Sequence, residues 1–492
     1  MSFNQVQHKN VVNMTTVLMK EIKVMQRSID IIDPHVCSDS KDRNSVLFSI
    51  CEPLVKRSGR QFEPCLAESW KADNEAREWV FRIRDKARFH DERQATSEDF
   101  IITMERALDP ALGGAYGTQG VYRSYLGDSS FQILDRHRIK ISLPHPMADL
   151  LDILSEIPVV SKDSIGDLPD TLSGSGPYYV TDKDPRHIKL KRFEDHWGHL
   201  GNYEKATFLC EPTEENRVEA LERGEADIIS GLSPRGALYF RDKINVQVKT
   251  SESALCIIYL CNALKGPCVD HRVRKALNCA LDVPTIIRDV KKGEAWQLSG
   301  PLTASHYGFD PEAPPYINET DKARQLLKDA GCADTEIKVD TPFTMPDEAL
   351  ELTRIIGSQL EKVGINVEIR VHEDREKYAQ MVRNKEIGDL CCFDSSPLSA
   401  LRVYREKIHS GYKGPWWQGY TNKVVDSLID RTQGILDINR REAIYKKIFR
   451  ILNDEAPWLF LYTPKSLFGV SRRKAMKWSP DQYGLIKLFE NI

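Results

Sequence analysis

The chain has 492 residues, of which 41% are hydrophobic and 29% charged, and its net charge at pH 7 is −3. This length suffices for roughly three domain-sized units of about 150 residues each, with a sizeable core. A nearly neutral chain has no electrostatic reason to bind DNA or RNA. No stretch approaches the ~18 consecutive apolar residues that a membrane span needs. We therefore expect no nucleic-acid partner and no direct membrane span.

Eleven cysteines are scattered along the chain, and no CxxC pair is present. The twelve histidines do not cluster, and HExxH is absent. We therefore expect no metal site, no cofactor and no catalytic residue. Cys391 and Cys392 lie in an apolar string without a histidine nearby in sequence, so we expect buried strand cysteines. Taken alone, this cysteine usage indicates a reducing compartment.

In chain order, the predicted elements alternate between strands and helices. The first twenty residues contain no apolar run long enough for the core of a signal peptide. WVFRIR (79–84) alternates like a strand, and Thr96 with Asp99 is placed to cap the next helix. LCIIYLC (255–261) and DLCCF (389–393) are short apolar runs typical of strands that are buried on both faces.

Several helices are predicted between and after these two strands. Asp270 precedes an apolar stripe at helical spacing, and Thr320 precedes another that Gly331 ends. A third helix leads through Gly364 into the alternating strand INVEIRV (365–371). Two late helices are expected around 424–433 and 440–453, with Asn439 and Glu442 placed as the capping box of the second. The alternation predicts an α/β protein with open, largely parallel sheets covered by helices.

One local unit occurs twice. LERGEADIIS (221–230) and VRNKEIGDLCCF (382–393) both read as a helix end, a tight turn and a buried strand opened by an aspartate. The repeat predicts two lobes built on similar plans. Ligands of open α/β sheets bind beyond the carboxyl ends of the strands. We therefore expect residues 230–233 and 394–396 to face a common cleft; the alternative is that both are ordinary polar turns.

Several segments also follow one another in the order of a known family. They are LAESWKADNEAREWVFRIRDKARFHDERQATSEDF (66–100), GSGPYYV (174–180) with KLKRFEDHWG (189–198), LCNALKGPCVDHRVRKALNCALDVPTIIRDV (260–290), KVGINVEIRV (362–371), QGYTNKVVDSLID (418–430) and APWLFLY (456–462). Together they resemble bacterial extracellular solute-binding protein family 5, which serves peptide, oligopeptide and nickel ABC importers. The resemblance covers nearly the whole chain.

This resemblance implies a type II periplasmic-binding-protein fold with two hinged lobes and an extra domain inserted in the first. It implies interlobe crossings near residues 261–263 and 462–465, and closure of the lobes on a ligand. The implied segments are 1–47 for the first lobe, 48–165 for the inserted domain, 166–260 for the first lobe again, 261–463 for the second lobe and 464–492 for the return to the first.

The candidate ligand residues lie at the strand ends and in one tryptophan-containing string. They are Asp394, Ser395, Ser396, Trp416, Trp417, Gln418, Ser230 and Gly231. The resemblance implies that an acid near Asp394 holds a ligand ammonium; the alternative is a carboxylate that caps a turn or a helix. The two tryptophans are expected to stack on a ligand, and the alternative is that one is core and the other covers the surface.

Arg402 and Tyr404 are a further pair with two possible roles. They are placed either to meet a ligand carboxylate or to face solvent on a helix, and we favour solvent exposure.

The function implied is the substrate-binding component of a peptide-type ABC importer. Such a protein captures a small peptide or peptide-like solute, delivers it to the permease subunits and catalyses nothing. We expect a monomer in the periplasm or cell envelope. The alternative is a cytoplasmic ligand sensor that reuses the fold, which the missing signal sequence and the eleven cysteines motivate.

Overall fold

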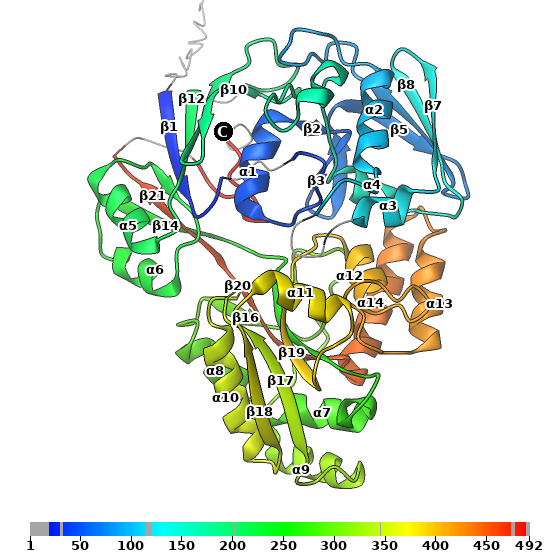
Figure 1. Cartoon of the computed structure of the whole chain (residues 1–492), viewed down its shortest axis with the longest axis vertical. Helices are drawn as coiled ribbons and strands as arrows, with labels where there is room; N and C mark the ends of the chain where they lie inside the picture. Colours follow the sequence, from blue (N-terminus) through cyan, green and yellow to red (C-terminus); the bar gives the residue numbers. More distant parts are fainter. Residues whose placement is uncertain are drawn as a thin grey trace, which may run out of the picture.

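The computed structural model describes residues 19–29, 33–114, 118, 120–200, 203–344, 346–473 and 478–488. The expectation about a signal peptide concerns residues that lie mostly outside these ranges. Figure 1 shows two lobes, one above the other, with a further unit beside the upper lobe. We call the sheet of each lobe the upper and the lower sheet, and we call the further unit the insert.

The upper sheet forms the first lobe from segments far apart in sequence. Its seven strands lie in the order β10 (Tyr178–Asp184), β11 (His187–Arg192), β12 (Tyr203–Cys210), β1 (Met19–Gln26), β13 (Ile228–Ile229), β21 (Ser466–Ser471) and β14 (Val246–Ser251). The helices of this lobe are α1 (Lys41–Ile50), the 3₁₀ helix η1 (Lys162–Asp167), α5 (Glu214–Arg223) and α6 (Pro234–Phe240).

The insert contains a four-stranded sheet and two short strand pairs. The sheet has the order β5 (Ala67–Ala72), β6 (Glu78–Ile83), β8 (Arg138–Ser142) and β7 (Ser130–Asp135). The pairs are β2 (Glu52–Pro53) with β9 (Pro158–Val159), and β3 (Val55–Ser58) with β4 (Gln61–Pro64). The helices are α2 (Ser97–Ala107), α3 (Val121–Leu126) and α4 (Leu150–Leu154).

The lower sheet organises the second lobe. Its six strands have the order β16 (Ala295–Gln297), β20 (Trp458–Pro464), β15 (Cys256–Cys261), β19 (Leu390–Ser395), β17 (Glu336–Pro342) and β18 (Asn366–His372). The helices are η2 (Pro267–Val269), α7 (His271–Ala280), α8 (Val283–Asp289), α9 (Thr320–Asp329), α10 (Ala349–Glu361), α11 (Arg375–Arg383), α12 (Ala400–Lys407), α13 (Lys423–Thr432) and α14 (Ile438–Glu455).

The two apolar runs of the sequence are the central strands of the lower sheet. Every residue of β15 is buried, with Ile258 and Leu260 in the core on one face and Ile257 and Tyr259 in the core on the other. Cys391 and Cys392 of β19 are buried free thiols. The prediction of strands covered on both faces is therefore confirmed.

The prediction of largely parallel sheets is wrong. β1 runs parallel to β12 and β13, and β17 runs parallel to β18 and β19, as alternating strands and helices require. The remaining neighbours in both sheets are antiparallel. In the upper sheet, β10 and β11 form a hairpin. In the lower sheet, β15 enters from the first lobe and runs opposite to both of its neighbours, β19 and β20.

The repeated helix–turn–strand unit has the same geometry in both lobes. The main-chain N–H of Asp227 donates to Lys23 O (2.8 Å), and its carboxylate accepts from Lys23 N (2.9 Å). Asp389 does the same with Lys338, whose O and N lie at 2.9 and 2.8 Å. Each aspartate thus fixes its strand against a parallel neighbour. The matching contacts confirm that the two lobes share a local plan.

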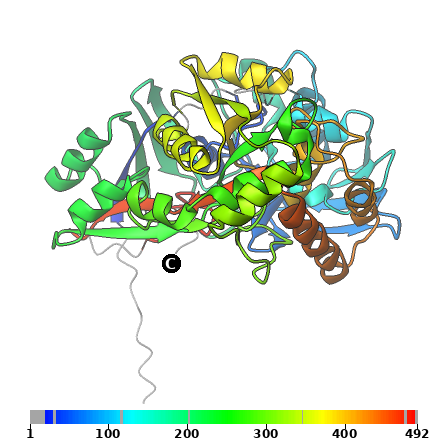
Figure 2. The same cartoon turned by 90° about the horizontal axis from the view of Figure 1, so that it is seen from below.

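The chain passes between the lobes twice. One crossing follows residues 252–255, between β14 of the upper sheet and β15 of the lower sheet. The expected place near residues 261–263 is wrong, because β15 lies wholly in the lower sheet. The other crossing is at Lys465, between β20 and β21, within the expected stretch. Figure 2 shows these two strands as one long band that joins the lobes.

The predicted helix caps are partly correct. Thr96 and Asp99 form a capping box on α2, and the Asp270 side chain accepts from Arg272 N at the start of α7. The capping box expected from Asn439 is wrong. α14 begins two residues before its expected start at residue 440, and Asp437 caps it by accepting from Arg440 N.

The GSGP motif packs against the end of α1, so it offers a test of the fold. A Cβ added at Gly174 would lie 2.1 Å from Ile50 O, and Gly176 N donates to the same oxygen (2.9 Å). Gly174→Ala should lower the free energy of unfolding by about 3 kcal/mol, as overpacking at backbone does. At Gly166 an added Cβ meets nothing within 4 Å. Gly166→Ala is therefore the control, and equal melting temperatures for the two variants would contradict this account.

Candidate functional site

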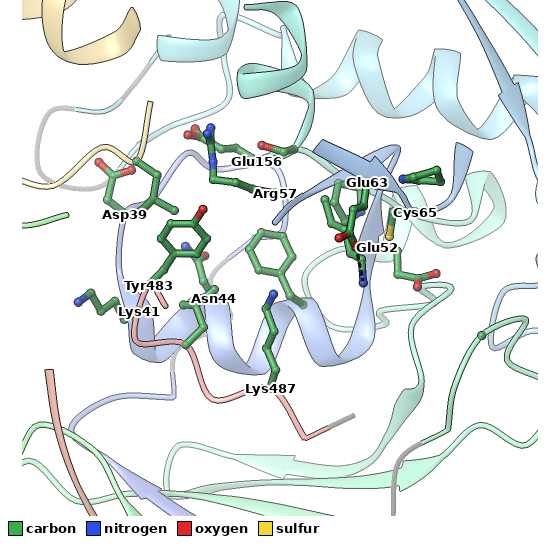
Figure 3. A pocket seen from close by; sticks show the side chains of 18 of the residues that line it. Asp39, Lys41, Asn44, Glu52, Arg57, Glu63, Cys65, Glu156, Tyr483 and Lys487 are labelled. Atoms are coloured by element: carbon green, nitrogen blue, oxygen red, sulfur yellow. Dashed lines mark ion pairs between the residues drawn. The ribbon is translucent and has the colours of Figure 1, made fainter. Parts of the chain in front are cut away.

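A pocket of about 740 Å³ lies between α1, the insert and the edge of the second lobe. Figure 3 shows Asp39 and Lys41 toward one end, and Glu52, Glu63 and Cys65 at the other. Its lining residues are Ser38, Asp39, Lys41, Asn44, Phe48, Glu52, Pro53, Lys56, Arg57, Glu63, Pro64, Cys65, Arg84, Ser155, Glu156, His196, Trp197, Gly198, His199, Ala254, Ser396, Leu398, Tyr483, Leu485 and Lys487. This volume is in the range of small-molecule sites.

Helix α1 forms one wall of the pocket. Lys41, Asn44 and Phe48 recur at the spacing of one helix face and line the pocket, while Val46 and Ile50 point into the core of the first lobe. Ser40 caps the helix by accepting from Arg43 N (3.4 Å). The helix therefore presents polar side chains to the pocket from a rigid support.

Arg402 on α12 joins the three parts of the protein at one end of the pocket. Its guanidinium lies 3.0 Å from carboxylate oxygens of Asp39 in the first lobe, Glu156 at the end of α4 in the insert, and Glu406 on its own helix. The Arg402 side chain is 2% exposed. Tyr125 of the insert donates to Glu406 as well (3.1 Å). One buried cation thus forms ion pairs with three carboxylates.

The shared guanidinium leaves Glu156 short of positive charge. Burial raises the pKa of Glu156 to about 7; Arg402 opposes this increase, and Asp39 adds to it. Glu156 and Asp39 line the pocket together with the cations Lys41 and Arg57, so this end of the pocket carries groups of both charges.

The other end of the pocket is built around Glu52. Its carboxylate accepts from Trp197 Nε1 (2.8 Å) and Ser175 Oγ (2.9 Å), and lies 3.1 Å from His196 Nε2. Arg84 lies over the Trp197 ring, 3.9 Å from its centroid. These contacts fix the indole as an aromatic surface at the pocket wall, which can stack on a ligand.

The two strand ends predicted to face a common cleft, residues 230–233 and 394–396, both contact the start of α1. Ser396 Oγ donates to Asp39 (3.2 Å), and Ser230 Oγ donates to Asp42 (3.0 Å). Asp39 and Asp42 flank the start of α1. The structure therefore brings residues of both lobes to one helix end. Of the eight predicted ligand residues, all of which are described, Ser396 alone is among those lining the pocket.

Four of the other predicted residues are held by internal contacts. Trp416 packs on Phe393 with ring centroids 5.1 Å apart, Trp417 Nε1 donates to Tyr420 O (2.6 Å), and Gln418 Nε2 donates to Val382 O (2.7 Å). Gly231 O accepts from Arg217 (3.0 Å). The two tryptophans are each 7% exposed, so both belong to the interior.

Asp394 and Ser395 belong to strand β19. The Asp394 carboxylate accepts from Arg375 of α11 (3.0 Å), so in this structure it neither caps a helix nor lines the pocket. Ser395 is buried, and its Oγ has no hydrogen-bond partner. A role in ligand binding stays a prediction for Asp394 and Ser395, as for the other predicted residues.

The expectation that Arg402 and Tyr404 face solvent is wrong. Both are buried, because α12 lies between the second lobe and the insert. Tyr404 is part of the lower core, while Arg402 reaches the carboxylates described above. Most pocket residues come from segments that sequence analysis left unassigned. The helical spacing of Lys41, Asn44 and Phe48 is one signal that could have indicated a polar helix face.

The described residues contain neither a metal-binding cluster nor a membrane-spanning helix. No group of three or more histidine, cysteine, aspartate or glutamate side chains there is arranged to hold a metal ion. In the same part of the chain, no helix combines the length and the apolar composition of a membrane span.

Two hinged α/β lobes with a pocket between them define a solute-binding protein. The family described as "Bacterial extracellular solute-binding proteins, family 5 Middle" matches residues 61–391, and the chain belongs to this family. The resemblance seen in the sequence, and the two-lobed α/β fold it implies, are thereby confirmed.

Relatives match over most of their length. The chain is 25% identical to "Probable D,D-dipeptide-binding periplasmic protein DdpA" of Escherichia coli K12 over 475 residues, which cover 90% of this chain and 88% of the relative. It is 23% identical to "Heme-binding protein A" of Haemophilus influenzae, with 82% and 79% covered. The structure of DppA from Helicobacter pylori, in complex with the peptide STSA, has a TM-score of 0.79 at 22% identity, with 96% and 97% covered.

The arginine cluster should control lobe closure. Arg402→Met leaves three carboxylates without their common cation, and breaking a buried ion pair in this way costs about 3–5 kcal/mol. We expect a lower melting temperature and a larger radius of gyration in small-angle X-ray scattering. Arg405→Met on the same helix removes a cation that stacks on Tyr125 and Tyr412 and serves as the control. An unchanged radius of gyration for Arg402→Met would contradict the proposed link.

Glu156 gives a prediction for pH dependence. Its folded pKa of about 7 lies above its ordinary value of 4.5. The protonated carboxyl therefore stabilises the fold at low pH, and this contribution is lost as the pH rises from about 4.5 to about 7. Glu156→Gln cannot ionise, so its melting temperature relative to the wild type should increase between pH 5 and pH 8. Glu225→Gln at an exposed position is the control, and a constant difference for Glu156→Gln would exclude the raised pKa.

Proposed function

We propose that this protein is the solute-binding component of a peptide-type ABC importer, which captures a peptide or peptide-like solute between its lobes. The observation that carries the proposal is the pocket of about 740 Å³ at the junction of the first lobe, the insert and the second lobe. Family membership and the peptide-binding relatives support it. Delivery of the solute to permease subunits follows from this role.

Polar contacts between different parts of the protein support capture by closure of the lobes. Asp149 of the insert accepts from Tyr445 OH of α14 (2.6 Å) and pairs with Arg441 (3.0 Å). Arg27 of the first lobe pairs with Asp347 of the second (2.7 Å). Contacts of this kind can separate to admit a solute and reform around it.

The proposal places the protein in the periplasm or cell envelope, as a monomer without catalytic activity. The relatives named as periplasmic support this location. The eleven cysteines are compatible with it, because nine of them are buried. Burial raises the pKa of Cys37, Cys51 and Cys256, so these thiols stay protonated and unreactive. Fractionation of cells that express the natural gene tests the location.

Binding is tested by titration calorimetry against di- and tripeptides, with native mass spectrometry of the purified protein for bound solute. We expect a dissociation constant of about 1 μM or below. Ser396→Trp should abolish binding, because the indole fills the pocket that Ser396 lines. Thr181→Trp, on the exposed part of β10, is the control. The absence of any bound or binding solute, or equal binding by both variants, would contradict the proposal.

A further inference from the structure

Lys41 occupies a special place at the first turn of α1. Its ammonium donates to Ser253 Oγ (3.0 Å) and to Ser466 Oγ (2.7 Å). Ser253 belongs to the crossing between β14 and β15, and Ser466 opens β21 directly after the crossing at Lys465. One side chain therefore touches both connections between the lobes, and the same side chain lines the pocket.

Three other cations of the pocket have carboxylate partners, while Arg84 donates to the main-chain oxygen of Cys65. Arg57 pairs with Asp152, Lys56 lies 3.7 Å from Glu63, and Lys487 lies 3.5 Å from Asp481. Within the described ranges, no carboxylate lies at ion-pair distance from Lys41, whose partners are the two serine hydroxyls. An ammonium has three donors, so one of them remains for a further partner.

The surroundings of Lys41 make an anion favourable there. Burial lowers the pKa of Lys41 to about 8, and the more distant charges of Asp42 and Asp481 oppose this decrease only in part. An ammonium removed from water without a paired anion is costly, and a charge-assisted hydrogen bond that the ammonium donates to a carboxylate offsets that cost. Figure 3 shows Lys41 and Asn44 at the same side of the pocket. A ligand group that enters the pocket there meets the partly exposed side chain of Lys41.

We propose that Lys41 binds the carboxylate of the solute and thereby links the ligand directly to both interlobe crossings. This inference rests on the proposed function and narrows it: the solute is an acid, such as a peptide with a free C-terminus. The bound carboxylate compensates the Lys41 charge, and the ammonium holds Ser253 and Ser466 at the same time. Occupancy of the pocket and the position of the crossings are therefore coupled through one side chain.

The test compares each ligand acid with its amide. A panel of Ala-X dipeptides is prepared with a free C-terminus and as the C-terminal amide, and both forms are titrated into the wild type and Lys41→Met. The wild type should bind acids roughly 10- to 100-fold more tightly than amides, as the loss of one charged hydrogen bond predicts. In Lys41→Met this preference should fall to about 1, because acid binding weakens and amide binding changes little.

Two further variants separate charge recognition from damage to the hinge. Lys487→Met removes another pocket lysine, one that lies near Asp481, and should keep the preference for acids. The double variant Ser253→Ala and Ser466→Ala keeps the Lys41 charge and removes its two hydroxyl partners. It should also keep the preference for acids, while scattering shows a smaller change in the radius of gyration upon binding.

The outcomes distinguish this inference from the proposed function. If the wild type binds acids and amides equally, or if Lys41→Met retains the preference, the inference is wrong and solute binding stands. A co-purifying solute without an acidic group would likewise contradict the inference and leave solute binding intact. If neither form of any dipeptide binds and no solute co-purifies, the proposed function fails and the inference fails with it.

Discussion

One buried guanidinium joins the three parts of this protein. Arg402 comes from the second lobe, yet two of its three carboxylate partners belong to the first lobe and the insert. A buried charge without partners is far more costly than an exposed one. The second lobe therefore cannot withdraw without exposing Arg402 to water together with Asp39 and Glu156. Because those two carboxylates line the pocket, the interaction that holds the lobes together also sets the charge of the cavity.

Helix α1 connects this cluster to the rest of the site. Asp39 precedes its first residue, Lys41 begins it, and Asp42 accepts from Ser230 at the end of β13. The far end of the helix packs on the glycines of the GSGP motif. Its position is thus fixed at both ends, and its polar face keeps a constant direction. The motif at residues 174–177, distant from the pocket in sequence, contributes to the site by holding the helix that forms its wall.

Sequence analysis predicted the fold better than the pocket, for physical reasons. The apolar runs in β15 and β19 and the aspartates that open strands, Asp227 and Asp389, are visible within a few adjacent residues of the sequence. Trp416 and Trp417 were expected at a ligand because their identity is distinctive, but burial depends on neighbours such as Phe393, which sequence spacing does not reveal. Arg402 was misjudged similarly, because two of its three carboxylate partners, Asp39 and Glu156, lie hundreds of residues away.

The two charged regions of the pocket are linked by covalent geometry. Asp39 and Lys41 are two residues apart at the start of one capped helix, so closure cannot change their separation much, whereas it does change the distance from either to the second lobe. A solute that binds to this helix would therefore keep its position relative to the first lobe when the lobes move. The second lobe responds through Arg402 on one side and through the crossings near Ser253 and Ser466 on the other. Pocket and crossings thus share one rigid element, because Lys41 contacts both crossings and Asp39, two residues earlier, contacts Arg402.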